Sequence, residues 1–467
     1  MKDILVSDVV RICKGNLLFG KEGDICRVFC KDTREVKDGD VYVGIKGENF
    51  DGNLLYKEAF EKGAKIAILQ NVGVTDEDIK KYENDGKSIV IVDDTVIALG
   101  QIAKYKRSLY NIPVVAITGS VGKTSTKDII ASVVSKKYKV LKTEGNLNNH
   151  IGLPLTLLKL KDHEAVVVEM GMNHTGEISY LTNIAKPTIA VITNIGTSHI
   201  GNLGSRENIL KAKLEILEGL DEGKEVIINN DNDLLHTINS EKYKLIKYGI
   251  EEESELMPYN IEIKDIYSTY NIKIKNKEYN VKVPISGKHF IYNSLSAFAV
   301  GLSLDIKIED IIHGIEDFEL TKKRMDIQVL KNKDISYTVI NDSYNASYDS
   351  MKASFEYLKE VKGNRKIAVL GNMLELGNFS EELHKKVGKE VYKNDVDVLV
   401  TVGDLAKNIS KQAIEKGFSI ENIKEFENNT DVIEFLKNIV IDGDIILLKA
   451  SNSMNFTSIL EGLNKGE

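Results

Sequence analysis

Continuous apolar runs alternate with segments of helical periodicity through the middle of the chain. Such runs occupy residues 114–117, 165–168 and 189–192, and polar residues follow each of them. Parallel strands buried on both faces have this composition, whereas half-exposed strands alternate apolar and polar residues. Strands that alternate with helices predict an α/β protein with a mostly parallel sheet.

Further α/β patterns precede and follow this central region. Strand-like runs are found at 40–45, 65–69, 88–92, 366–371, 396–403 and 444–449, with helical segments between them. Alternating residues around a turn at 276–277 predict an antiparallel hairpin beside the main sheet. The length of 467 residues also suits about three domains. We therefore expect domains at 1–95, 96–321 and 322–467, of which the last is Rossmann-like but has no dinucleotide fingerprint.

The run at 114–117 leads into a glycine-flanked turn and then a helix. The sequence from Val114 to Thr126 is V-V-A-I-T-G-S-V-G-K-T-S-T, and apolar residues then recur at helical spacing. Backbone N–H groups of such a turn, together with the helix N-terminus, bind phosphate. Lys123 would contact the β and γ phosphates, and the Thr124 hydroxyl would reach a Mg²⁺ ion. The pattern predicts a nucleoside triphosphate site formed by Gly119, Ser120, Val121, Gly122, Lys123, Thr124 and Ser125.

This loop is a shorter variant of the G-x-x-x-x-G-K-[ST] pattern. Ile117 stands where the pattern requires its first glycine, and the first glycine here is Gly119. The alternative interpretation is a plain strand–turn–helix with an exposed lysine. The Gly-Lys-Thr-Ser sequence at a strand-to-helix junction favours the phosphate site.

An acid and a histidine follow the two other central strands. Glu169 ends the run at 165–168, and His199 lies in the loop after 189–194. Ligands of parallel sheets bind beyond the carboxyl ends of the strands, where both side chains and the phosphate loop are expected. A single acid or histidine is usually structural, but two at neighbouring strand ends suggest metal ligands.

A lysine interrupts the apolar face of a helix predicted from about Ser205 to Leu220. Ile209, Ala212, Ile216 and Leu217 recur at helical spacing, and Lys213 occupies the same face. A buried ammonium is costly unless it is paired, and its pKa falls until it becomes a neutral, reactive amine. The alternative is a lysine whose charge reaches solvent at the edge of the helix.

Composition and charge restrict the classes of partner. The formal net charge is −8 with an isoelectric point near 5.7, which argues against nucleic acid as the main partner. Three cysteines, an odd number in a long chain, fit a reducing compartment. No apolar run has membrane length, and no targeting segment is recognisable. We expect a cytoplasmic enzyme, monomeric, that binds no membrane.

Six motifs, taken in order along the chain, resemble those of the Mur ligases. They are T-G-S-V-G-K-T at 118–124, N-L-N-N-H-I-G-L-P at 146–154, V-E-M-G-M at 168–172, T-N-I-G at 193–196, D-S-Y-N-A at 342–346 and M-L-E-L-G at 373–377. The resemblance spans essentially the whole chain. It implies an N-terminal domain for a UDP-linked substrate, a central ATPase domain and a C-terminal Rossmann-like domain.

The resemblance also implies an activity and its substrates. The expected enzyme is an ATP-dependent amide ligase that adds D-alanyl-D-alanine to UDP-N-acetylmuramoyl-tripeptide through an acyl phosphate, with ATP and Mg²⁺ as cofactors. The third residue of the tripeptide, diaminopimelate or lysine, is open. A related Mur-type or folylpolyglutamate-type ligase with another amine acceptor is the alternative. A nucleotide-dependent switch is a further alternative, although it would need neither a lysine in the apolar face of a helix nor a separate N-terminal domain.

Site residues carried over from the family match positions in this sequence. Lys123, Lys213, His199 and Glu169 are expected to be catalytic. Thr124, Glu169, His199 and a carbamate on Lys213 are the expected magnesium ligands. The matches to nucleotide contacts are Asn293, Arg324 and Asp342, and those on the UDP-substrate side are Thr33, Arg34 and Asn149. Departures from the usual family residues are found at Phe290, Asn341, Tyr348, Asn372, Ala450 and Asn452.

Overall fold

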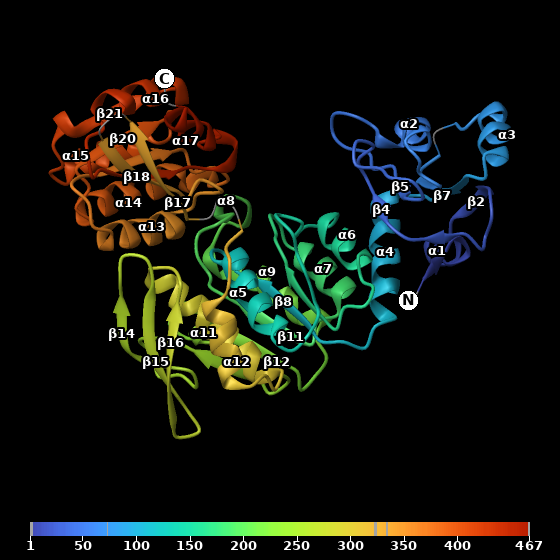
Figure 1. The fold of residues 1–467 in the computed structure, drawn as a ribbon, viewed down its shortest axis with the longest axis horizontal. Helices are drawn as coiled ribbons and strands as arrows, with labels where there is room; N and C mark the ends of the chain where they lie inside the picture. The colour runs from blue at the N-terminus through green and yellow to red at the C-terminus, as the bar shows by residue number, and fades with distance from the viewer. Residues whose placement is uncertain (1–2, 72, 322–324, 333–334, 466–467) are drawn as a thin grey trace. The chain divides into compact units, whose positions relative to one another are not determined.

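The computed structural model of the protein describes residues 3–71, 73–321, 325–332 and 335–465. The chain packs into two compact units, each of which is assembled from several stretches of sequence. The first comprises residues 1–117, 137–190 and 214–224, and the second comprises 118–136, 191–213 and 225–467. Figure 1 shows the elements in chain order from blue to red. None of the helices in the described ranges combines the length and the apolar composition needed to cross a membrane.

The central strands form the parallel sheet that the apolar runs predict. Its six strands lie in the order β13–β12–β11–β8–β10–β9. Their bounds are β8 Val114–Thr118, β9 Val140–Lys142, β10 Ala165–Glu169, β11 Ile189–Ile192, β12 Glu225–Asn229 and β13 Lys244–Tyr248. Every residue of β8, β10 and β11 is buried, which explains why their sequences are continuous apolar runs.

The N-terminal region contains a small five-stranded sheet in the first unit. Its order is β2–β7–β6–β5–β4, and only the pair β2–β7 is antiparallel. The strands are β2 Asn16–Phe19, β4 Phe29–Cys30, β5 Val41–Val43, β6 Ile66–Leu69 and β7 Ser88–Ile91. Helix α4, Thr95–Ser108, follows β7 and is capped by Asp94, whose carboxylate accepts the N–H groups of Val96 and Ile97.

The C-terminal region contains a second six-stranded sheet in the order β17–β18–β22–β19–β20–β21. The strands are β17 Asp326–Asn332, β18 Ile335–Asn341, β19 Lys366–Gly371, β20 Val398–Val402, β21 Ile423–Phe426 and β22 Ile445–Lys449. Only β17, at one edge, runs antiparallel to its neighbour. Helices α16, Asn429–Ile439, and α17, Thr457–Asn464, pack on one face (Figure 1). This layered α/β arrangement agrees with the Rossmann-like prediction.

One predicted helix is shorter than expected, and the predicted hairpin has a third strand. The helix expected over 205–220 is shorter in the structure: α9 spans Arg206–Leu214, and a 3₁₀ turn, η2, follows at Glu215–Gly219. The Thr182 hydroxyl donates to the Ile216 carbonyl, and a Cβ on Gly219 would lie 2.3 Å from the Thr182 carbonyl oxygen, so tight packing governs this last turn. The predicted hairpin is present as the antiparallel pair β15 Ser268–Ile274 and β16 Lys277–Val283, and β14 Pro258–Ile263 adds a third strand beside β15.

Candidate active site

The phosphate loop lies between β8 and helix α5, Lys123–Ser135, as predicted. Gly119 and Gly122 have φ angles of 155° and 83°, which other residues rarely adopt. A Cβ on Gly119 would lie 1.9 Å from Thr193 Oγ1, and one on Gly122 would lie 3.2 Å from Asn293 Oδ1. Both glycines are therefore required by backbone conformation and by close neighbours.

Asn194 organises this loop, a role that sequence reasoning did not assign. Its Oδ1 accepts the N–H of Ser120 at 3.1 Å and that of Val121 at 2.9 Å. The Ser120 hydroxyl in turn accepts the N–H of Gly196 at 2.9 Å. The signal available in the sequence was the position of Asn194 at the end of a buried strand beside the loop.

Lys123 Nζ donates to the Gly119 carbonyl at 2.9 Å and approaches that of Ser120 at 3.4 Å. Its charge thus lies over the loop whose amides are expected to bind phosphate. Thr124 is buried at the first turn of α5, and its side chain lines a pocket with that of Ser125. Residues of the loop and of the first turn of α5, including Gly122 and Thr124, thus form part of the pocket wall.

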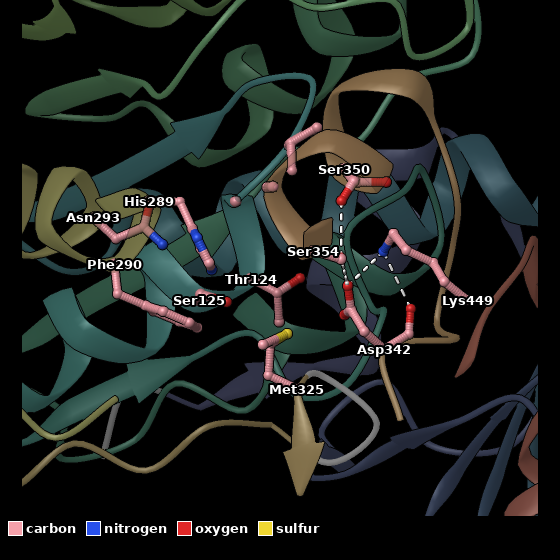
Figure 2. A pocket seen from close by; sticks show the side chains of 13 residues that line it. Thr124, Ser125, His289, Phe290, Asn293, Met325, Asp342, Ser350, Ser354 and Lys449 are labelled. Atoms are coloured by element: carbon pink, nitrogen blue, oxygen red, sulfur yellow. Dashed lines mark hydrogen bonds and ion pairs between the residues drawn. The ribbon is translucent and has the colours of Figure 1, made fainter. Parts of the chain in front are cut away.

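The pocket lies within the second unit, and Figure 2 shows the side chains around it. It brings together predicted nucleotide contacts from distant parts of the sequence, namely Asn293 of helix α11, Lys288–Ser303, and Asp342 after β18. Sequence reasoning missed Lys449 at the end of β22, whose ammonium pairs with Asp342 Oδ2. The Ser354 hydroxyl donates to the same oxygen at 2.8 Å. Two partners therefore fix the Asp342 carboxylate in the pocket wall.

Two rings at the start of α11 also line this pocket and were missed as site residues. The rings of His289 and Phe290 have centroids 4.3 Å apart. Loss of solvent lowers the pKa of His289 to about 4, so the imidazole is neutral at pH 7. Phe290, one of the departures from the family pattern, is 1% exposed and supplies apolar surface to the pocket.

Lys213 is buried on α9, as its place in the apolar face predicts. Its exposure is 1%, and Ile209, Ala212 and Ile216, which form the apolar face around it, are fully buried. Burial, followed by the charge of Lys123, lowers the pKa of Lys213 well below 10.5. Lys211 is exposed on the same helix. Both influences on Lys213 favour the neutral amine over the ammonium, and the neutral amine is the form that reacts with CO₂ to give a carbamate.

Glu169 and His199 belong to different units, so their proximity stays a prediction. Glu169, at the end of β10, is 2% exposed, and its Oε1 accepts from Asn148 Nδ2 at 2.7 Å. His199 precedes the short helix α8, Ile200–Leu203, with a φ of 63°. Its Nδ1 lies 2.7 Å from Glu375 Oε2. The described residues hold no group of three or more His, Cys, Asp and Glu side chains suited to a metal.

The residues predicted on the UDP-substrate side make local contacts. The Thr33 hydroxyl donates to Glu58 Oε1 at 2.9 Å, and the exposed Arg34 pairs with Asp32 at 2.6 Å. Asn149 Oδ1 accepts the N–H groups of Ile151 and Gly152 at the start of helix α6, Gly152–Leu158. Arg324 lies outside the described residues.

Comparison with known proteins gives three family models that match successive parts of the chain. The Mur ligase family catalytic domain matches residues 30–107, the Mur ligase middle domain 117–301, and the Mur ligase glutamate ligase domain 323–452. The UDP-N-acetylmuramoyl-tripeptide–D-alanyl-D-alanine ligase of Bacillus subtilis is 36% identical over 98% of both chains. The Escherichia coli enzyme of the same name is 32% identical over 93% of both.

Solved structures give the same grouping. The chain is similar to MurF from Acinetobacter baumannii, with a TM-score of 0.87, 27% identity, and 100% and 99% of the two chains covered. It is also similar to the MurF ligase of Thermotoga maritima in complex with ADP, with a TM-score of 0.81, 27% identity, and 94% and 97% covered. Three domain matches and full-length identity above 30% agree with the loop and the buried lysine: the chain belongs to the Mur ligase family.

Proposed function

We propose that the protein is the ATP-dependent ligase that joins D-alanyl-D-alanine to UDP-N-acetylmuramoyl-tripeptide in peptidoglycan precursor synthesis. The substrates are those named for relatives that match over nearly the whole chain. The observation that carries the chemistry is the burial of Lys213 near the charge of Lys123, which lowers its pKa and has no purpose in a plain nucleotide switch. The domains would be 1–95, 96–321 and 322–467, and the enzyme would act in the cytoplasm as a monomer.

The reaction needs activation of a poor acylating agent. A carboxylate oxygen of the tripeptide attacks the γ-phosphorus of ATP, ADP leaves, and an acyl phosphate results. The amine of D-alanyl-D-alanine then attacks the acyl carbon, loses a proton, and displaces inorganic phosphate. The protein contributes mainly positioning and neutralisation of charge. Lys123 serves both, because its ammonium lies over the phosphate loop.

A magnesium ion fits the donor chemistry of the proposed ligands. Thr124, Glu169 and His199 supply oxygen and nitrogen donors, and carbamylation would turn Lys213 from an amine into an oxygen donor. The lowered pKa of Lys213 supports this assignment, because it favours the neutral amine and an ammonium would repel the ion. When bound, the ion would neutralise phosphate charge during transfer.

The pocket of Figure 2 would take the nucleoside part of ATP. We assign Asn293 to the adenine and Asp342 to the ribose, and Arg324 to phosphate. Asp342 is suited to a ribose hydroxyl because Lys449 and Ser354 fix the orientation of its carboxylate, an acceptor for hydroxyl groups, in the pocket wall. Thr33, Arg34 and Asn149 are proposed for the UDP-linked substrate.

Acceptor competition tests the substrate assignment. Release of ADP and phosphate should require both the UDP-linked tripeptide and an amine, and D-alanyl-D-alanine should outcompete D-alanine and L-lysine by at least about 100-fold in kcat/KM. A site shaped for a dipeptide leaves polar groups unpaired with a single amino acid. For the UDP-linked substrate, tripeptides that end in diaminopimelate and in lysine should be compared. Equal rates with single amino acids would leave only the ligase class, and phosphate release without any amine would favour the switch.

A further inference from the structure

The loop that carries His199 is contacted by two acidic side chains from the region matched by the glutamate ligase domain. Asp349 Oδ2 accepts the N–H of Thr197 at 2.6 Å and its hydroxyl at 2.7 Å. Glu375 Oε2 lies 2.7 Å from His199 Nδ1. All of these residues belong to the second unit. We propose that Asp349 and Glu375 are positioning residues: Asp349 fixes the 196–201 loop, and Glu375 sets the orientation and tautomer of His199.

Two glycines of the loop, Gly196 and Gly201, allow the region that carries Asp349 and Glu375 to approach closely. A Cβ on Gly196 would lie 2.4 Å from Asp349 Oδ2, and one on Gly201 would lie 2.6 Å from the Glu375 carbonyl oxygen. The Gly201 N–H also donates to that carbonyl at 3.2 Å. Any larger residue at either position would displace the loop or the acidic residue against it. Both ends of the loop are thus fitted closely to the region that carries Asp349 and Glu375.

The segment that carries Glu375 is itself anchored. The Met373 N–H donates to Nε2 of the buried His384 at 3.0 Å, and the Leu374 N–H donates to Ser451 Oγ at 2.9 Å. Burial lowers the pKa of His384, which keeps Nε2 available as an acceptor. Glu375 has a φ of 64°, and the surrounding bonds support this uncommon conformation. The carboxylate therefore reaches His199 from a rigid base rather than from a free loop.

A carboxylate at Nδ1 has a specific effect on a neutral imidazole. At 2.7 Å from Nδ1, its negative charge favours a proton on that nitrogen over one on Nε2, which leaves the Nε2 lone pair for a metal. The Glu375 side chain is 50% exposed, so this contact adds little to the stability of the fold. The contact matters instead for the orientation of His199 and for which of its nitrogens is available to a metal. This step rests on the proposed function, in which His199 is a magnesium ligand.

Matched variants test the role of Glu375. Glu375→Gln removes the charge but keeps an acceptor, and Glu375→Asn shortens the side chain while tolerating a positive φ. Glu382→Gln is the control, because Glu382 is a similarly exposed acid paired only with Lys386 in the same region. Mn²⁺ affinity of the ADP-bound protein should fall about 10- to 100-fold in Glu375→Asn and less in Glu375→Gln. The control should match wild type, and kcat should fall more than KM rises.

The tautomer provides a readout that a merely structural role would not change. In protein labelled with ¹⁵N-histidine, the His199 resonances, assigned by their loss in His199→Gln, should report the Nδ1–H form in wild type and a mixed form in Glu375→Asn. Unchanged resonances and unchanged Mn²⁺ affinity would overturn the proposal. This measurement uses no substrate, so it is independent of whether the ligase assignment is correct.

Asp349 has its own test through Gly196. Gly196→Ala should displace the Asp349 carboxylate, and Asp349→Ala should remove it, each lowering kcat about 10-fold. Because both changes break the same contact, the double variant should be no worse than the poorer single variant. Additive losses would show that Asp349 does not act through this loop and would overturn its part of the proposal.

Discussion

Helices α5 and α9 each bury one lysine, and the two lysines have opposite chemistry. Lys127 in α5 and Lys213 in α9 are both 1% exposed. Lys127 Nζ lies 2.9 Å from Asp128 Oδ1, and Asp128 also accepts the N–H and hydroxyl of Thr321. The influences on Lys213 are burial and the positive charge of Lys123, and both lower its pKa. At equal burial, one lysine is therefore half of an ion pair, and the surroundings of the other favour its neutral form.

The difference shows which buried charges indicate function. A buried lysine beside a carboxylate has a sufficient structural explanation. A buried lysine that faces another cation is unfavourable for folding and needs another reason to be present. In this protein that reason is the proposed carbamate.

Removal of the neighbouring cation should give the largest effect. Lys123→Ala removes the charge over the phosphate loop, so ATP turnover should fall by about 1000-fold. The melting temperature should change little, because the Lys123 ammonium is not part of the core. Substantial turnover in the folded variant would remove the assignment of the ATP site.

Removal of the neutral amine should have the next largest effect. Lys213→Ala should lower ligation by about 100-fold, and acetate or formate should restore part of the rate by presenting oxygen to the metal in the vacated space. Lys211→Ala is the control, since Lys211 is exposed on the same helix. The interpretation fails if Lys211→Ala is the defective enzyme or if no carboxylate gives rescue.

Removal of the paired lysine should affect stability instead. Lys127→Ala removes the ammonium that lies beside the buried Asp128 carboxylate and should lower the free energy of unfolding by about 3 kcal/mol. Lys136→Ala breaks an exposed pair with Asp317 and should cost less than about 1 kcal/mol. Denaturant titration measures both. Equal costs for the two variants would contradict the contrast between buried and exposed pairs.

The smallest effect concerns pH. In the native protein the pKa of Lys213 is below 10.5, the value of the free side chain, so between these two pKa values the unfolded state binds one more proton. Stability from this residue therefore rises with pH across that window and is lost as pH falls, with a slope of at most about 1.4 kcal/mol per pH unit. Lys213→Met should flatten the profile in CO₂-free buffer. An unchanged slope would mean that Lys213 is charged in the native state.

Much of the fold followed from patterning, because continuous apolar runs identify buried parallel strands directly. The phosphate loop and the burial of Lys213 were likewise local features of the sequence. The contacts of Lys449 with Asp342 and of Glu375 with His199 were not, since they join residues more than 100 positions apart. The 3₁₀ turn at Glu215–Gly219 was missed for a related reason: helical periodicity continues through it, and packing against Thr182 determines its form.

The direct measurement for the account is ¹³C NMR of the protein equilibrated with ¹³C-bicarbonate. A neutral Lys213 amine should give a carbamate resonance in wild type and in Lys211→Ala, and Lys127→Ala should retain it if folded. Lys213→Ala should lack it, and acidification should remove it as the amine is protonated. A wild-type spectrum without the resonance, or one in which Lys213→Ala retains it, would contradict the assignment of Lys213 as the carbamylated residue.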